Sequence, residues 1–184
     1  QRREATFCNL GQRLSAAGTP KEAARIIVEE ADALWPWDAC VLSLYTPGRR
    51  AANTVLCIDT IAGRRTEILP EASAALLSPI ARRVLEEGPQ LVLRPADTCF
   101  PVDSIPFGDA DHASASLMYV PVRKDSETIG LLSLQSYTPN AYTEADLGTL
   151  QALADHCGSA LDRIRSEVAL AESNEQLRMA LAAG

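Results

Sequence analysis

Apolar residues recur at spacings of three and four, without a break, from Leu147 to Ala171. The positions in this repeat are Leu147, Leu150, Ala154, Cys157, Leu161, Ile164, Val168 and Ala171. This spacing places them on one face of an α-helix, and its strict alternation is the seam of a coiled coil. Thr143 and Asp146 stand at the N-cap and the third helical position before the repeat. The pattern therefore predicts one long helix that begins after Thr143.

The repeat changes phase near Val168 and resumes as Leu170, Asn174, Leu177 and Leu181. Such a slip is a stutter, which locally unwinds a coiled coil. We expect the first half of the helix to pack on its own domain, and the part beyond about Arg163 to be covered by a partner helix. The residues that we assign to the dimer contact and to signalling are Leu150, Cys157, Leu161, Ile164 and Val168.

The start of the chain predicts two more helices. Residues 4–16 carry apolar side chains at helical spacing, and Gly18 ends this helix. Thr19-Pro20-Lys21-Glu22 is a capping box with proline at the first helical position. The helix that it opens ends before Pro36.

The middle of the chain alternates between short apolar runs and turn residues. Strands are predicted at 38–45, 54–61, 66–69 and 91–93, and a hairpin joins 116–122 to 128–134. Ser78-Pro79 opens a helix between them, and Gly88-Pro89 ends it. Strands that pair as antiparallel neighbours, with helices before and after, predict an α+β fold in which one sheet is flanked by helices. Residues 94–115 have no periodicity, and so long a loop in a compact domain is typical of a lid or binding loop.

Residues from about 15 to 165 resemble a GAF domain, a sensory module of signalling proteins, and the second half of the chain resembles its C-terminal half. The resemblance rests on three strings, Val120-Pro121-Val122, Ile129-Gly130-Leu131-Leu132 and Tyr142-Thr143-Glu144-Ala145-Asp146-Leu147. It implies a GAF-like antiparallel sheet flanked by helices, with a long C-terminal signalling helix. Gly130 would permit close backbone approach within a strand, and Pro121 belongs at an edge or bulge.

The last thirteen residues, 172–184, resemble the entry helix of a PAS domain. The organisation expected from both resemblances is an N-terminal helix (1–17), a GAF domain (18–165) and a coiled-coil linker helix (166–184) that leads into a PAS-like domain. Bacterial proteins with this layout are most often sensor histidine kinases and next diguanylate cyclases.

The composition argues against several other classes of protein. The formal net charge of −7 and the lack of a long basic cluster argue against nucleic-acid binding. No apolar run approaches the roughly 18 residues of a membrane span. The five cysteines are odd in number and share no close spacing, so we expect neither a disulfide framework nor a zinc site, but reduced thiols in the cytoplasm.

A small ligand is expected between the sheet and the helix that holds Arg82, beneath the 94–115 loop. The residues that we assign to this pocket are Arg82, Asp97, Cys99, Phe100, His112 and Met118. Asp97-Thr98-Cys99-Phe100 resembles the Asp-x-Cys-Phe motif of bilin-binding cyanobacteriochromes. The later cysteine, Cys157, is followed by Gly158 rather than by His or Tyr, which argues against bilin.

Other cofactors and reactions also find little support. A lone His112 in an acidic loop is more typical of a solvated side chain than of a haem or metal ligand. The aspartates of that loop lack the spacing of a calcium site. We find no cyclic-nucleotide signature, no paired cysteines for reducing methionine sulfoxide, and no catalytic constellation. The cofactor is therefore left unknown.

The resemblance thus implies a sensory GAF domain of a cytoplasmic signalling protein, expected to be a sensor histidine kinase, that relays its signal through the C-terminal helix. It would form a homodimer through its N- and C-terminal helices and bind an unknown small molecule. The alternatives are a ligand-free dimerisation module and the GAF domain of a diguanylate cyclase.

Overall fold

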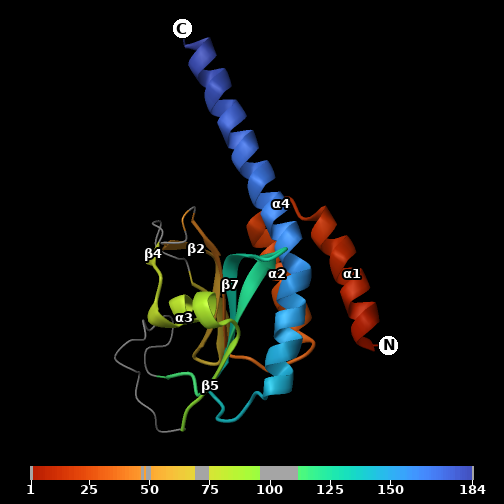
Figure 1. Ribbon diagram of the computed structural model, residues 1–184, viewed down its shortest axis with the longest axis vertical. Coiled ribbons are helices and arrows are strands. Elements are labelled where there is room, and N and C mark those ends of the chain that lie inside the picture. The colour runs from red at the N-terminus through yellow and green to blue at the C-terminus, as the bar shows by residue number, and fades with distance from the viewer. Residues whose placement is uncertain (1, 47, 49–50, 69–74, 96–111, 184) are drawn as a thin grey trace.

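The computed structural model describes residues 2–46, 48, 51–68, 75–95 and 112–183, with the side chains of these residues except 2–8 and 75–76 (Figure 1). The helices are α1 (Arg2–Ala16), α2 (Pro20–Asp32), α3 (Pro79–Glu87) and α4 (Glu144–Ala182). The strands are β1 (Ala39–Tyr45), β2 (Ala51–Ile61), β3 (Arg64–Glu67), β4 (Ala75–Leu76), β5 (Gln90–Leu93), β6 (Ser116–Lys124) and β7 (Glu127–Ser136).

The described strands form one antiparallel sheet in the order β3-β2-β1-β7-β6-β5, and β4 pairs with the start of β2. Helices α1, α2 and α4 lie on one face of this sheet and α3 on the other (Figure 1). This arrangement confirms the α+β fold with flanking helices and a long C-terminal helix. The short strand β4 was not predicted, because two residues carry no periodicity.

The main core lies between the sheet and α1, α2 and α4. Strand residues alternate between the two faces, so Met118, Val120 and Val122 of β6 point into this core. Leu10 and Leu14 of α1 are also buried in it. The N-terminal helix therefore belongs to the same packed unit as the rest of the domain.

Side-chain caps explain where the main helices begin. Thr143 Oγ1 accepts from the N–H of Asp146, and the Asp146 carboxylate accepts from the N–H of Thr143, which confirms the predicted cap of α4. The Trp35 indole N–H donates to Asp146 at 2.9 Å, so this cap also fastens the end of α2 to α4. The cap of α2 differs from expectation in one bond, because Glu22 accepts from the N–H of Gly18 rather than of Thr19.

Two sequence expectations about the hairpin are confirmed. A Cβ on Gly130 would lie 2.4 Å from the backbone oxygen of Ser43, so only glycine fits between β7 and β1. Pro121 lies beyond the residues of β6 that pair with β5, where β6 becomes an edge strand. None of the helices that the structure describes is long and apolar enough to cross a membrane.

Candidate functional site

The sheet face that carries α3 bears a band of uncharged polar side chains. This polar band consists of Ser43 on β1, Thr54 on β2, and Ser133 and Gln135 on β7. Ser43, Ser133 and Gln135 are only 8%, 2% and 7% exposed. Gln135 Nε2 donates to Ser133 Oγ at 2.9 Å, and the hydroxyl oxygens of Ser43 and Thr54 lie 3.4 Å apart. Buried polar groups need hydrogen-bond partners, and these four side chains supply them to one another in pairs. The band therefore places hydroxyl and amide groups, which can both donate and accept, on the face that carries α3.

Apolar residues hold α3 beside the polar band. Tyr45 and Leu131 of the sheet pack with Ala81 and Val84 of α3. Tyr119 lies opposite Ser133 across the β6–β7 ladder, and burial raises the pKa of its phenol to about 12 against the opposing effect of Arg94. The phenol therefore stays neutral at physiological pH, and the side chains of the neighbouring polar band are uncharged as well.

Tyr137, Asp59 and Thr60 are linked by hydrogen bonds near the ends of β7 and β2. The Tyr137 hydroxyl donates to Asp59 Oδ1 at 2.5 Å, and the Asp59 carboxylate also accepts from the N–H of Thr60. Burial, aided by Asp59, raises the pKa of Cys57 to about 12. That thiol is accordingly protonated and a weak nucleophile.

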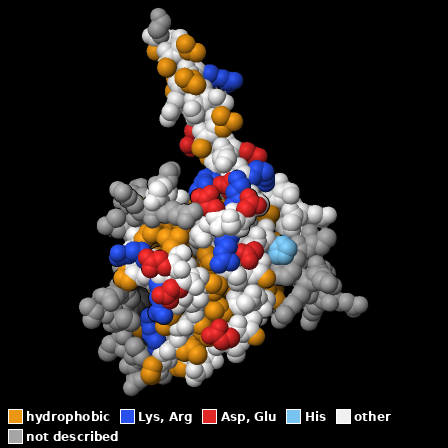
Figure 2. Space-filling model, in the orientation of Figure 1, with side chains coloured by type: hydrophobic (Ala, Val, Ile, Leu, Met, Phe, Trp, Pro, Cys, Tyr) orange, Lys and Arg blue, Asp and Glu red, His pale blue; other side chains and the backbone are white. Residues whose placement is uncertain are grey.

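On the opposite face, α4 is fastened to the sheet where the helix leaves the body. A Cβ on Gly158 would fall 1.6 Å from the backbone oxygen of Arg123, so α4 touches the end of β6 directly. One turn later, Asp162 accepts from Lys124 at 2.6 Å and from Arg165 at 2.8 Å. Arg165 also donates to the backbone oxygen of Tyr45 at 3.4 Å. We call Lys124, Asp162 and Arg165 the exit clamp. Charged side chains of both signs gather at this level (Figure 2).

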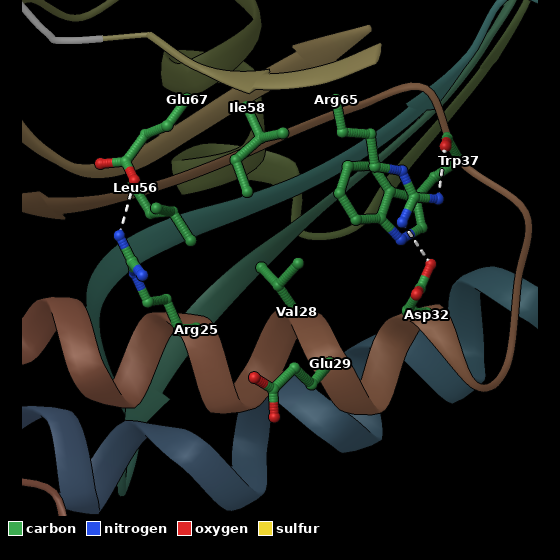
Figure 3. Close-up of a pocket in the computed structure, with 9 residues that line it drawn as sticks. All are labelled: Arg25, Val28, Glu29, Asp32, Trp37, Leu56, Ile58, Arg65 and Glu67. Atoms are coloured by element: carbon green, nitrogen blue, oxygen red, sulfur yellow. Dashed lines mark hydrogen bonds and ion pairs between the residues drawn. The ribbon is translucent and has the colours of Figure 1, made fainter. Parts of the chain in front are cut away.

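A shallow groove of about 340 Å³ lies between α2 and the strands β2 and β3. Figure 3 shows ion pairs at its two ends, Arg25 with Glu67 and Arg65 with Asp32, and apolar side chains between them. The Arg65 guanidinium also stacks on Trp37, 3.6 Å from the ring centre. The fifth charged residue that borders the groove, Glu29, pairs with Arg13, so all five charged groups there already have partners. The groove lies beside α2, and the predicted pocket beside α3.

The described residues contain no group of three or more His, Cys, Asp or Glu side chains that could hold a metal ion. A GAF domain family model matches residues 17–162. The chain belongs to the GAF domain family.

Solved GAF domains share this fold at low sequence identity. The GAF domain of a phosphoenolpyruvate-protein phosphotransferase from Acinetobacter is 17% identical, with 90% of this chain and 96% of that chain covered and a TM-score of 0.67. The GAF domain of a sensor histidine kinase from Pseudomonas syringae pv. tomato is 20% identical, with coverages of 94% and 93% and a TM-score of 0.59. Free methionine-R-sulfoxide reductase from Neisseria meningitidis is 16% identical, with coverages of 90% and 91% and a TM-score of 0.60. Among curated proteins, no sequence matches significantly.

The ligand residues expected from the sequence do not gather around one site of this GAF domain. Arg82 is exposed on α3, and His112 is exposed with its ring 5.7 Å from that of Tyr137. Met118 is fully buried on the other face of the sheet, in the main core, so its assignment to the pocket is wrong. Asp97, Cys99 and Phe100 lie outside the described residues.

The residues assigned to the dimer contact need a similar correction. Leu150, Cys157, Leu161 and Ile164 are 0% exposed within this single chain, and Val168 is partly buried against the same core. Leu150, Cys157, Leu161 and Ile164 pack on the GAF domain's own sheet and helices, so these four side chains are not available to a partner, whereas Val168 is covered only in part. The seam has the period of a coiled coil because the same spacing serves any helix that buries one narrow face.

Sequence reasoning missed the polar band, although a signal was present. Polar residues stand at alternate positions inside apolar runs, in Leu42-Ser43-Leu44 and in Leu131-Leu132-Ser133-Leu134-Gln135. Such alternation places the polar side chains together on one face of a strand.

Proposed function

We propose that this GAF domain is a sensory and regulatory module of a cytoplasmic signal-transduction protein. It binds a small molecule against the polar band and passes the bound state to the following domain through α4. The observation that carries this proposal is the continuity of α4. Its first half is buried against the sheet through Ile164, and the same helix then projects beyond the body (Figure 1).

The contacts of Tyr45 support a link between the two faces. Its side chain packs with Val84 and Leu131 beside α3, and its backbone oxygen accepts from Arg165 of the exit clamp. A ligand that displaces the end of β1 would therefore move an anchor of α4. The helix would respond as a rigid rod, because it continues without a break from Glu144 to Ala182.

The ligand that fits this face is small, uncharged and able to form several hydrogen bonds. The polar band holds hydroxyl and amide groups, and Tyr119 beside it is a neutral phenol. An ionised ligand would lose hydration without gaining an opposite charge from these residues.

The protein that contains this domain is proposed to be a sensor histidine kinase, with a diguanylate cyclase as the alternative. The Pseudomonas relative supports the first choice at the level of the fold. The PAS-like start at 172–184 stays a prediction, and the helical conformation of residues 172–182 is compatible with it.

Native mass spectrometry tests ligand binding. The purified domain is incubated with the low-molecular-weight extract of a bacterial host, and its native and denatured spectra are compared. We expect added mass in the native spectrum that is lost on denaturation and is absent from Ser133→Leu, which fills the polar band. Thr149→Leu, at a half-buried position of α4 on the other side of the sheet, is the control and should keep the added mass. A wild-type spectrum without added mass contradicts the proposal.

A ligand-free dimerisation module is the second candidate. It is favoured by exposed leucines on the projecting part of α4, at positions 170, 177 and 181. In that case wild type and Ser133→Leu would both form dimers of bare chains.

A catalytic role like that of the Neisseria reductase has less support. The described thiols Cys40, Cys57 and Cys157 are buried, and burial raises the pKa of each to about 12. Thiols in this state exchange slowly, so we propose a regulatory domain without catalysis of its own.

A further inference from the structure

A buried hydrogen-bond donor borders the groove between α2 and the strands β2 and β3. Trp37 is only 4% exposed, and its indole Nε1 has no hydrogen-bond partner among the residues that the structure describes. Folded proteins contain few such groups, because a buried N–H without a partner costs its full desolvation energy. The N–H of Trp37 is therefore left for an acceptor that comes from outside this part of the chain.

A charged donor lies directly over the same indole. The Arg65 guanidinium is 3.6 Å from the Trp37 ring centre and donates to Asp32 Oδ1 at 2.6 Å, at one end of the groove (Figure 3). Asp32 therefore marks a position in which this end of the groove holds a carboxylate. The side chains of Asp32 and Arg65 are 50% and 39% exposed, and exposed ion pairs contribute little to stability. A carboxylate from another molecule can thus take the place of Asp32.

Between the ion pairs at its two ends the groove is lined by aliphatic side chains. These are Val28 of α2 and Leu56 and Ile58 of β2, which we call the aliphatic floor (Figure 3). The volume of about 340 Å³ lies at the lower end of the range for small-molecule sites. A hydrocarbon chain that covers the floor would remove apolar surface from water, which favours binding.

We propose that the groove beside α2 binds a small aliphatic monocarboxylate. One carboxylate oxygen accepts from Trp37 Nε1 and the other accepts from Arg65 in place of Asp32, while the hydrocarbon chain lies on the aliphatic floor. A doubly charged phosphate would fit less well, because the carboxylates of Asp32 and Glu29 also border the groove. The site lies on the other side of the sheet from the polar band, so the inference does not depend on the proposed function.

Nuclear magnetic resonance of the isotope-labelled domain tests the contact with the indole. The chain has two tryptophans, so there are two indole N–H signals, and Trp37→Phe assigns them. Titration with sodium hexanoate should move the Trp37 signal downfield and leave that of Trp35 in place, since the Trp35 N–H already donates to Asp146. The uncharged hexanol is the control ligand and should have a far smaller effect. A Trp37 signal that hexanoate does not move would overturn the proposal.

Calorimetry with hexanoate tests the two charged residues. Arg65→Met should weaken binding by at least about tenfold, because a hydrogen bond from a charged donor is lost. Arg64→Met is the matched control and should bind as wild type does, since Arg64 is the exposed neighbour on β3 and does not line the groove. Asp32→Ala should bind about two- to fivefold more tightly, because the competing carboxylate is gone. Weaker binding by Asp32→Ala, or equal losses in the two arginine variants, would contradict the proposed contacts.

Two further comparisons locate the ligand. Hexanoate should bind more tightly than butanoate, by about threefold to fourfold for each added methylene that the aliphatic floor covers. Ser133→Leu, which alters the polar band, should bind hexanoate as wild type does. Equal affinities for the two acids would show that the floor is not used, and loss of binding in Ser133→Leu would place the carboxylate on the other face. Either result would overturn the proposal. Circular dichroism checks that each variant keeps the fold.

Discussion

The contact between Gly158 and Arg123 gives the sharpest prediction about how α4 is held. Adding one methyl group, as in Gly158→Ala, would place a Cβ 1.6 Å from the backbone oxygen of Arg123. Cβ atoms do not approach other heavy atoms more closely than 3.0 Å. The backbones of α4 and β6 must therefore move apart until this distance has grown from 1.6 Å to at least 3.0 Å. The neighbouring residues Ala154, Cys157 and Leu161 are fully buried, and such a displacement would disturb all of them.

Two opposing terms set the size of the effect. Alanine is favoured over glycine inside a helix by about 1 kcal/mol. Overpacking a closed contact costs about 1–3 kcal/mol, and more where the backbone has to move. We therefore expect Gly158→Ala to lower the free energy of unfolding by at least about 1 kcal/mol. Gly148→Ala provides the matched control, because a Cβ at Gly148 of the same helix meets nothing within 4 Å. It should raise the free energy of unfolding by up to about 1 kcal/mol.

Urea denaturation followed by circular dichroism measures both changes. The free energy of unfolding falls by about 1–3 kcal/mol for each molar increase in urea, so the unfolding midpoints of the two variants should differ by about 1 M. Gly158→Ala should have the lower midpoint and Gly148→Ala the higher. If both substitutions raised the midpoint equally, α4 would not touch β6 at this position, and the account of how the helix is held would be wrong.

Three further predictions concern the exit clamp, the thiols and the cap of α4. Asp162→Asn should lower the free energy of unfolding by about 1–2 kcal/mol at neutral pH. The hydrogen bond from Lys124 lowers the pKa of Asp162, so its contribution is present above about pH 4 and lost as the pH falls through the folded-state pKa. The free energies of unfolding of wild type and Asp162→Asn should therefore converge as the pH is lowered. A difference that stays constant with pH would contradict the stabilising role of the Asp162 carboxylate. Cys40, Cys57 and Cys157 should react with a thiol reagent at pH 8 only after unfolding in the Cys8→Ser, Cys99→Ser background, and rapid reaction of the native protein would refute their burial. Thr143→Ala should cost about 1 kcal/mol of stability in the same urea assay, whereas Thr149→Ala, at a half-buried position within the helix that caps nothing, should not.

The sequence was sufficient for the order of the described elements other than β4, because their signals are local. Thr143 with Asp146 marks the start of α4, and the apolar repeat after it fixes the helix and its buried face. Gly130 and Pro121 also indicated their positions in the hairpin, since each residue tolerates few environments. The resemblance to GAF domains then indicated how these elements combine into one fold.

The site was predicted less well because it depends on which face of a strand meets which helix. Met118 and Tyr119 are neighbours in the sequence, yet the first lies in the main core and the second packs against the cluster beside α3. The seam through Leu161 could equally be covered by a second chain or by the chain's own domain, because both produce the same spacing. Only the packing of α4 on β6 decides between them, and that packing depends on Gly158, whose role no local pattern reveals.

Hydrogen–deuterium exchange, with and without the molecule captured in native mass spectrometry, tests the sensory account most directly. The account predicts slower exchange in 41–45 and 131–135 on binding, together with altered exchange in 158–168, where α4 leaves the body. Slower exchange confined to 25–32 and 64–67 would place the ligand in the groove beside α2 and contradict the account.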